Sequence, residues 1–483
     1  MTAEAINIII TVEIAEQKVE LGTMALEVDD HLDERIHQAM LSAGKYLYMV
    51  LLQNLDDDLR EAVPKEWQNL GREERQLMSS VGWAAFKRRV YRDEKGRRRK
   101  PLDEVLGIKA HQRYSVSVQQ KASFLTSELP YREGAEILGW LLESYVSHNT
   151  IGRMVQQVGE SYQAREEDEL ERVFEQGEDI QPGHIPAKVL YGESDGVWIS
   201  LQREEKRKVE ARVAVFYTGK KMIGKGRKAL ENKVPVTRIV KNSQEWQETL
   251  LKTAYKHYDL TNTTQLMVGG DGNSWVRHSF DLLGLPSEFV LDRYHLYREA
   301  RRAFGFTRQT GDWITQICQE GLEAVLPDML QVVSQASPKA AEKMRKFIMY
   351  MVHNQDGLID PDCRTHLKVK AGNLGTIEGN VDKLVVRRLK GRGRSWSLKG
   401  AQAMLAVCLH KQELKQNAFH PFEKELQPKM RHKVRRSKQV NGDWCQAGIP
   451  SLHLCHANRP WALYLRKLIH PEGDLVLSKY GKS

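Results

Sequence analysis

The stretch from Lys188 to Gln202 constrains the fold more than any other part of the chain. It reads KVLYGESDGVWISLQ, an apolar and β-branched run with two carboxylates at its centre. Residues i and i+2 of a strand share one face, so Glu193 and Asp195 are expected to point the same way. Two carboxylates on one side of a core strand are costly unless a cation meets them, and a divalent metal is the simplest such partner. The stretch therefore predicts a core strand beside an acidic, metal-binding centre.

Length, charge and cysteine content limit the classes of protein to consider. A chain of 483 residues is too long for one small core, and its formal net charge of +10 makes an anionic partner plausible. Its five cysteines are scattered and odd in number, which is typical of a reducing cytoplasm and not of a disulfide framework. The apolar patch at residues 6–10 is too short to span a bilayer. We therefore predict a cytoplasmic protein that does not associate with membranes.

The first part of the chain predicts helices followed by a basic hairpin. Residues 1–70 are expected to be mostly helical. The run from Arg75 onward is typical of two strands around the turn Asp93–Gly96, and nine Lys and Arg residues lie between positions 87 and 100. Two interpretations stay open for this hairpin: a β-ribbon that contacts phosphates, or a solvated sheet edge that charge keeps soluble.

Two helices with a tight break between them follow the basic hairpin. Pro130 is suited to open the first helix, and Ser147 is a good N-cap for the second. This pattern matches a helix-turn-helix, in which His148, Asn149 and Arg153 would face the major groove of DNA. An ordinary helical hairpin would have the same spacing.

From Lys188 the order of elements predicts a mixed α/β core. Three strands come in succession, and helices and strands then alternate, which favours a sheet covered by helices. Asp195 lies on the first strand, Asp271 follows the fourth, and Glu378 lies on a later helix. This arrangement is the ribonuclease-H-like one, with sites beyond the strand ends. The segment 296–370 between the last strand and the Glu378 helix is expected to be a helical insertion.

The three acids are far apart in the sequence and can meet only through the fold. Three carboxylates suit Mg²⁺ or Mn²⁺, and two such ions per site would support phosphodiester chemistry. In that case Asp195 would bridge both ions, Asp271 and Glu378 would complete their ligand shells, and Glu193 would hydrogen-bond behind them. Taken singly, each acid could be a capped or solvated carboxylate, and Asp271 could belong to a turn before a helix.

Several motifs in order resemble one known family. ESDGVWISLQ, GGDGNSW, LDRYHLYR and GTIEGNV, followed by RRLKGRGRSWS, are similar to bacterial insertion-sequence transposases of the ISLre-two type, distant relatives of the Mutator-like DDE transposases. The resemblance implies a ribonuclease-H-like core with Asp195, Asp271 and Glu378 as catalytic metal ligands. Asp292 and His295 match the Asp-x-x-His motif of these relatives. We expect them to act near the scissile phosphate or to order the insertion; a helix cap and a packed histidine are the alternative.

The basic segment after Glu378 is expected to bind DNA. Four arginines in it are candidates for phosphate contacts, and Trp396 is a candidate for stacking on an extruded base, although such tryptophans are more often core. The arginines are Arg387, Arg388, Arg392 and Arg394.

The predicted protein is thus an α/β multidomain transposase with a ribonuclease-H-like catalytic core. A helix-turn-helix region would precede the core and bind double-stranded DNA at the element ends. The core would cleave strands and join them to target DNA with Mg²⁺ or Mn²⁺, as a homo-oligomer in the bacterial cytoplasm. A nuclease that does not join strands, and a non-catalytic DNA-binding protein derived from a transposase, are the alternatives. The expected regions are 1–70, 71–180 (hairpin and helix-turn-helix), 185–295 (core), 296–370 (insertion), 371–410 (core with Glu378) and 411–483 (basic tail).

Overall fold

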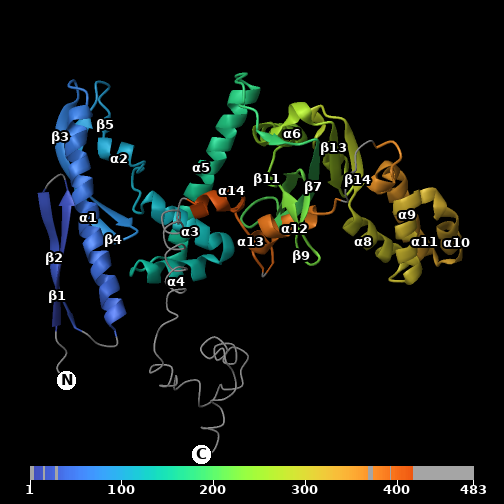
Figure 1. Cartoon of the computed structure of the whole chain (residues 1–483), viewed down its shortest axis with the longest axis horizontal. Coiled ribbons are helices and arrows are strands. Elements are labelled where there is room, and N and C mark those ends of the chain that lie inside the picture. Colours follow the sequence, from blue (N-terminus) through green and yellow to red (C-terminus); the bar gives the residue numbers. More distant parts are fainter. Residues whose placement is uncertain (1–4, 15–16, 28–30, 368–373, 392, 417–483) are drawn as a thin grey trace, which may run out of the picture. The chain divides into compact units, whose positions relative to one another are not determined.

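The computed structural model describes residues 5–14, 17–27, 31–367, 374–391 and 393–416 (Figure 1). The chain divides into two units after Ala418, and all described residues belong to the first. Arg392 and nearly all of the basic tail predicted for 411–483 lie outside the described residues. Within the described part the protein is mixed α/β, with several separate sheets, in agreement with the expected class.

The N-terminal region is only partly helical. Strands β1 (Ala5–Ile14) and β2 (Gln17–Glu27) form an antiparallel hairpin, and helix α1 (Leu32–Ala62) follows. The prediction of a mostly helical region is therefore wrong before α1. The reason is local: the run IIITV in β1 is entirely β-branched, and β2 has the alternating stretch KVEL near its start, which favours strands.

The basic hairpin belongs to a three-stranded antiparallel sheet. Its strands are β3 (Gln68–Ser79), β4 (Gly82–Arg92) and β5 (Arg98–Arg99), and α1 packs against β4. The turn predicted at Asp93–Gly96 joins β4 to β5, with Gly96 at a φ of 76°. The Asp93 carboxylate accepts hydrogen bonds from the backbone N–H groups of Lys95 and Arg97 and so stabilises this turn.

A group of helices connects this sheet to the rest of the chain. They are α2 (Pro101–Val105), α3 (Val116–Glu128), α4 (Tyr131–Leu141) and the long α5 (His148–Phe174). The prediction that Ser147 caps α5 is confirmed, since its side chain accepts from Thr150 N at 3.2 Å. Helix α14 (Leu398–Leu409) crosses α5 so closely that a Cβ on Gly159 would lie 2.4 Å from the carbonyl oxygen of Ala403.

The central sheet has five strands. In sheet order they are β11 (Val234–Arg238), β8 (Lys208–Tyr217), β7 (Val189–Ser200), β13 (Gln265–Gly270) and β14 (Ser287–Leu291). Strand β8 runs antiparallel to both of its neighbours, β7 and β11, whereas β13 and β14 run parallel to β7. A separate hairpin, β9 (Gly219–Gly224) and β10 (Arg227–Glu231), lies between β8 and β11 in the chain. Strands β6 (Ile185–Pro186) and β12 (Tyr258–Asp259) form a short parallel pair.

The two faces of this sheet bury different side chains, as the period of a strand requires. Leu190 and Phe216 pack with Trp246 of helix α6 (Ser243–His257) on one face. On the other face Tyr191 and Ile199 belong to the core that also contains residues of α5, α12 and α14. The sheet is therefore the middle of three layers (Figure 1).

Helices follow the last strand, as expected for the insertion. Helix α7 (Ser274–Arg277) precedes β14. Four helices follow β14, and they share a hydrophobic core of their own. These are α8 (Arg293–Phe304), α9 (Arg308–Glu320), α10 (Leu326–Gln335) and α11 (Pro338–His353). The chain then reaches α12 (Ile377–Val381), a π-helical turn (Asp382–Val386) and α13 (Arg387–Leu389). No helix in the described ranges has both the length and the apolar character needed to cross a membrane.

Candidate functional site

Asp195 lies on β7, the middle strand of the central sheet, and is almost buried. Its relative exposure is 8%, and the N–H of Gly196 donates to its Oδ1 at 2.7 Å. A Cβ on Gly196 would lie 2.4 Å from a carboxylate oxygen of Glu210, so a larger residue there would require the Glu210 side chain to move. The carboxylate of Asp195 is thus confined on β7, with Glu210 on the neighbouring strand β8.

Three side chains converge around Asp195. One potential ligand atom from each of Asp195, His295 and Glu378 lies within 4.8 Å of the others. Burial raises the pKa of Asp195 to about 6, and the charges of Asp271 and Glu378 add to the rise, while His295 and the Gly196 N–H oppose it. The fold therefore gathers residues that are more than 180 positions apart, from Asp195 to Glu378, into one acidic centre.

His295 is oriented by Asp292. Asp292 caps α8 by accepting from His295 N at 3.1 Å, and its Oδ2 also lies 2.8 Å from the Nδ1 of His295. Burial lowers the pKa of His295, but the hydrogen bond to Asp292 and the negative charges of Asp195 and Asp292 outweigh it, so the pKa is raised overall. With Nδ1 engaged, Nε2 is the ring atom left for the acidic centre. A carboxylate behind a histidine is the usual support of a metal-binding imidazole.

Glu193 holds the helix that carries Glu378. Its carboxylate is 1% exposed and accepts from the backbone N–H groups of Gly375, Thr376 and Ile377 at 3.0, 2.7 and 3.1 Å. The hydroxyls of Thr376 and Tyr217 donate to its other oxygen at 2.6 and 2.7 Å. These N–H groups are the free donors at the start of α12, so a buried anion there satisfies the helix end and favours its dipole. Glu193 thereby fixes α12 to β7, two residues from Asp195.

Asp271 lies beside the converging three residues but not among them. It follows β13, and its carboxylate accepts from Asn273 N at 3.0 Å and from Asn273 Nδ2 at 2.6 Å. Its charge still reaches the centre, since it raises the pKa of both Asp195 and Glu210, burial being the main cause in each case. The turn predicted as the alternative for Asp271 is thus present, and so is its proximity to Asp195.

The donor set fits a hard divalent cation. Two carboxylates and one imidazole are ligand types that Mn²⁺ accepts, and Mg²⁺ accepts the carboxylates together with water. Ligands of one ion at about 2.1 Å lie at most about 4.2 Å apart. The separations of up to 4.8 Å among Asp195, His295 and Glu378 therefore need only a small contraction.

The residues predicted to contact DNA are divided between surface and core. His148, Asn149 and Arg153 are exposed at the start of α5. Arg387 is exposed and pairs with Asp382 at 2.7 Å, and Arg394 donates to the Arg387 carbonyl at 2.9 Å.

Arg388 is placed differently from the expectation, whereas Trp396 lies in the core, which is the more common position for such tryptophans. Arg388 is 4% exposed, donates to the carbonyl of Thr126 and lies over the rings of Tyr131 and Trp396 at 5.1 and 4.9 Å. Trp396 is 8% exposed and donates to the carbonyl of Leu389 at 3.0 Å. Thr126 lies on α3 and Tyr131 on α4. Arg388 and Trp396 therefore pack against these two helices and are buried.

The first basic hairpin is mostly neutralised by neighbouring acids. Arg88 pairs with Asp103 and Arg89 with Asp56, at 2.9 and 2.8 Å. Four more of its basic side chains, those of Arg97, Arg98, Arg99 and Lys100, form ion pairs with Asp93, Glu73 and Glu104. Of the two interpretations left open, this pairing favours a charged sheet edge over a phosphate-binding ribbon.

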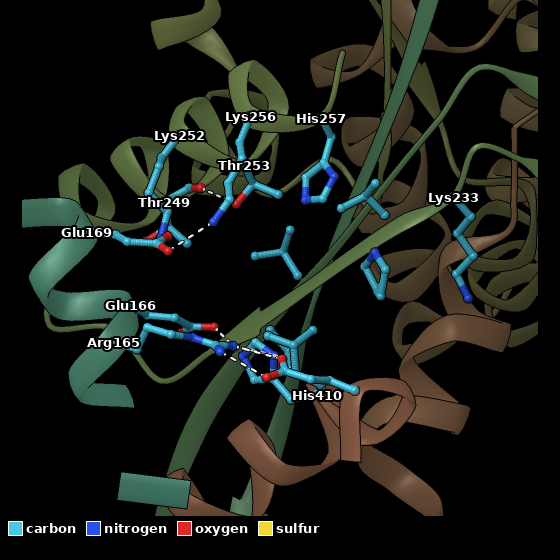
Figure 2. Close-up of a pocket in the computed structure, with 16 residues that line it drawn as sticks. Arg165, Glu166, Glu169, Lys233, Thr249, Lys252, Thr253, Lys256, His257 and His410 are labelled. Atoms are coloured by element: carbon cyan, nitrogen blue, oxygen red, sulfur yellow. Dashed lines mark hydrogen bonds and ion pairs between the residues drawn. The ribbon is translucent and has the colours of Figure 1, made fainter. Parts of the chain in front are cut away.

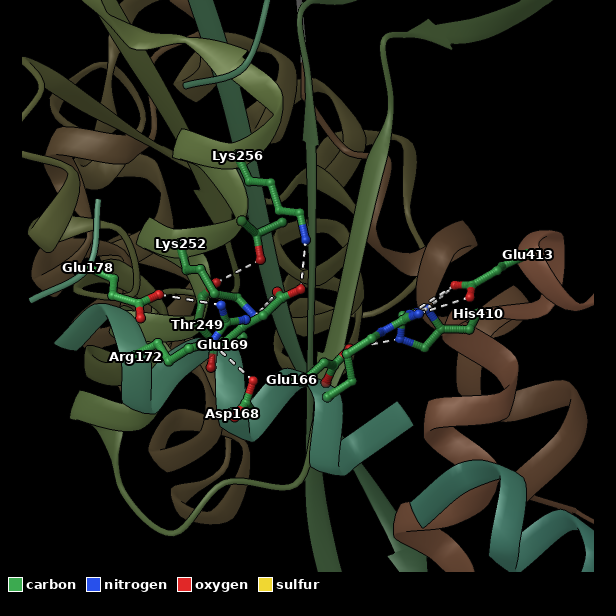
Figure 3. Close-up of polar contacts among 12 residues, drawn as sticks. Glu166, Asp168, Glu169, Arg172, Glu178, Thr249, Lys252, Lys256, His410 and Glu413 are labelled. Carbon is green, nitrogen blue, oxygen red and sulfur yellow. Dashed lines mark hydrogen bonds and ion pairs between the residues drawn. The ribbon is translucent and has the colours of Figure 1, made fainter. Parts of the chain in front are cut away.

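Sequence reasoning missed a polar cavity between α5 and α6. It has a volume of about 540 Å³, and Figure 2 shows Lys252, Lys256 and His257 of α6 across from Arg165 and Glu166 of α5. Glu169 accepts from Lys252 and Lys256 at 3.1 and 2.9 Å, as Figure 3 shows. The signal was present: an acidic helix follows position 163, and two lysines are spaced i, i+4 on the later helix.

The chain belongs to the UPF0236 family, described as an uncharacterised protein family, whose model matches residues 23–418. It is similar to a UPF0236 protein in the vanSb 3′ region of Streptococcus gallolyticus, with 28% identity over 80% of this chain and 84% of the relative. A UPF0236 protein of Caldanaerobacter subterraneus subsp. tengcongensis is 21% identical over 77% of this chain and 75% of its own length. Another from the same organism is 22% identical over 77% and 75%.

Removing the Glu193 carboxylate is expected to unfold the junction between β7 and α12. Glu193→Ala leaves five donors without an acceptor in a buried position, so the free energy of unfolding should fall by more than about 3 kcal/mol. Glu193→Gln should cost less, because its amide oxygen still accepts from the backbone and its NH₂ can donate to the two hydroxyls. Urea denaturation measures both.

The control for this substitution is Glu204→Ala. Glu204 is exposed and accepts one hydrogen bond, at 2.9 Å, from the backbone of Leu398 at the start of α14. Its loss should cost about 1 kcal/mol or less. Equal losses for the two alanine variants would contradict the role assigned to Glu193.

The raised pKa of Asp195 predicts a pH-dependent penalty in metal-free protein. The folded pKa of about 6 lies above the ordinary value of 3.8, so folding favours the protonated carboxyl, and the stability it contributes is lost as the pH rises from about 4 through 6. Two pKa units correspond to about 3 kcal/mol. With a chelator present, Asp195→Asn should therefore be more stable than the wild type at pH 8 and equal to it near pH 4. Denaturation at a series of pH values checks this, and a difference independent of pH would contradict it.

Proposed function

We propose that this protein is a DNA transposase that cleaves strands at the ends of its element and joins them to target DNA. The observation that carries the proposal is the convergence of Asp195, His295 and Glu378 within 4.8 Å at the middle strand of the sheet. Asp271 stands next to them and acts on the charge of Asp195. Titratable groups that converge from distant parts of the chain, with the pKa values of Asp195 and His295 both raised, are typical of a catalytic centre.

The order of the core strands supports a ribonuclease-H-like core. In chain order β7, β8, β11, β13 and β14 are the first to fifth strands, and in the sheet they are arranged 3-2-1-4-5. The first three are antiparallel and the last two run parallel to the first. Asp195 on the first strand, Asp271 after the fourth and Glu378 on a later helix are then the positions that the resemblance to DDE transposases implies.

The names of the relatives also favour a mobile element. One relative from Caldanaerobacter subterraneus carries eleven locus designations in its name, and another carries four. One protein sequence at several places in a genome is the distribution that an element which copies or moves itself would produce. A housekeeping nuclease does not require it.

The chain's own residues have distinct parts in the proposed reaction. Asp195, Glu378 and His295 would hold divalent metal, which when bound activates an attacking hydroxyl and stabilises the leaving oxygen of a phosphodiester. Glu193 and Asp292 keep the Glu378 helix and the His295 ring in position. Joining two ends requires at least two such centres, so we propose a homo-oligomer on DNA.

The helices α4 and α5 are the proposed reader of the element ends. They are joined by a short turn, and the second begins with the exposed residues His148, Asn149 and Arg153. A polar, exposed start of the second helix is where a helix-turn-helix contacts base edges in the major groove.

Strand transfer tests the proposal. Full-length protein is mixed with labelled DNA carrying its own element ends, a target plasmid and Mg²⁺ or Mn²⁺. Joined products are expected from the wild type, and Asp195→Asn should lower their rate of formation by about a thousandfold or more. Asp328→Asn, which removes an exposed acid on α10, is the matched control and should leave the rate unchanged.

The other outcomes separate the alternatives. Cleavage without joining would contradict strand transfer and favour a nuclease. Specific binding to the ends without cleavage or joining would contradict an enzyme and favour a DNA-binding protein derived from one.

A further inference from the structure

The hairpin of β9 and β10 carries an unusual run of exposed residues. Positions 221–228 read KMIGKGRK, and every one of them is exposed. The run contains four basic residues, two apolar residues and no acid. Its turn is tight, with Gly226 at a φ of 71°, and its base is fixed by Thr218 N, which donates to the Glu231 carbonyl at 3.0 Å. The β9–β10 hairpin is therefore an ordered element whose turn and flanking residues are exposed.

Its charges are not neutralised, unlike those of the first basic hairpin. Lys221, Lys225, Arg227 and Lys228 form no ion pair with any residue in the described ranges. In the β4–β5 hairpin, by contrast, Arg88, Arg89 and four further basic side chains are paired with acids. Four unpaired cations on one small hairpin repel each other and leave it suited to a polyanion.

A hydrogen bond links the hairpin to the segment that leads into the acidic centre. Lys220 donates to the carbonyl of Leu374 at 3.3 Å, on the segment that leads into α12 and Glu378. Burial lowers the pKa of Lys220, and the neighbouring Lys228 lowers it further, although Glu193 opposes them. A chain of phosphates lying along the hairpin would therefore continue toward the centre that is proposed to act on phosphodiesters.

The apolar residues on the hairpin match the same partner. Met222 and Ile223 are 60% and 62% exposed and lie next to the basic residues, on opposite faces of β9. Apolar side chains flanked by cations are what proteins insert between base steps in the minor groove of DNA.

We propose that the β9–β10 hairpin binds duplex DNA beside the acidic centre. Its lysines and arginine contact the phosphate backbone, and one apolar side chain of β9, Met222 or Ile223 according to the face that meets DNA, enters the minor groove. This inference rests on the proposed function for the identity of its partner. It adds a DNA-binding element that lies outside α4, α5 and the basic segment after Glu378.

DNA binding at a series of salt concentrations tests the proposal. The variant is Lys221→Ala/Lys225→Ala/Arg227→Ala in the full chain, and fluorescence anisotropy with labelled duplex DNA measures affinity. The slope of log affinity against log salt should become shallower by about three, because each removed cation leaves one phosphate without its partner and changes the slope by about one. Lys339→Ala/Lys343→Ala/Arg345→Ala removes three exposed cations from α11 and should keep the wild-type slope.

A second variant tests the apolar insertion. Met222→Ser/Ile223→Ser should weaken binding about tenfold or more at every salt concentration while leaving the salt slope unchanged. Thermal unfolding of all variants confirms that exposed substitutions leave the fold intact.

The outcomes separate this inference from the proposed function. A triple variant with the wild-type slope overturns the hairpin's role, even where the protein still joins strands. A triple variant that keeps its DNA affinity but no longer binds vesicles containing anionic lipid overturns it in favour of a membrane. If the hairpin governs DNA binding and the wild type never cuts or joins, the inference stands and the transposase does not.

Discussion

The carboxylate of Glu193 is the interaction on which the rest of the site depends. It is buried on β7 and satisfies three backbone N–H groups at the start of α12, together with two hydroxyls. Residues preceding α12 are far from β7 in the sequence. One anion in a dry environment therefore decides where Glu378 lies relative to Asp195. This interaction stabilises the fold strongly, because a buried carboxylate without donors and a helix end without an acceptor would each be costly.

The same strand sets the chemistry two residues later. Asp195 shares its face with Glu193, but among the described residues it receives one hydrogen bond, from Gly196 N–H, and it faces other acids and His295. A satisfied carboxylate beside an unsatisfied one divides the two roles: the first is structural, and the second is free to bind a cation. Asp292, directly after β14, is also structural: its carboxylate caps α8 and orients the imidazole of His295.

Much of the core could be predicted from the sequence, because strand and helix signals there are local. The strand at 189–200, the helix beginning at Ser243, the cap at Ser147 and the helices after β14 follow from patterning and capping residues. Side-chain roles that depend on distant partners could not be predicted. Arg388 and Trp396 are in a segment that reads as a basic surface, yet packing against α3 and α4 buries them. The first basic hairpin was conspicuous by composition, but its acids come from α1 and α2 and neutralise it. Four cations without an ion pair in the described residues lie in the less conspicuous β9–β10 hairpin.

We propose that Asp195, His295 and Glu378 form a divalent metal centre. Titration of the full-length chain with Mn²⁺, followed by the electron paramagnetic resonance signal of the free ion, tests it most directly. We predict saturable binding of up to about two ions per chain, abolished in Asp195→Asn and kept in Asp328→Asn. Mn²⁺ binding that is the same in both variants would contradict it.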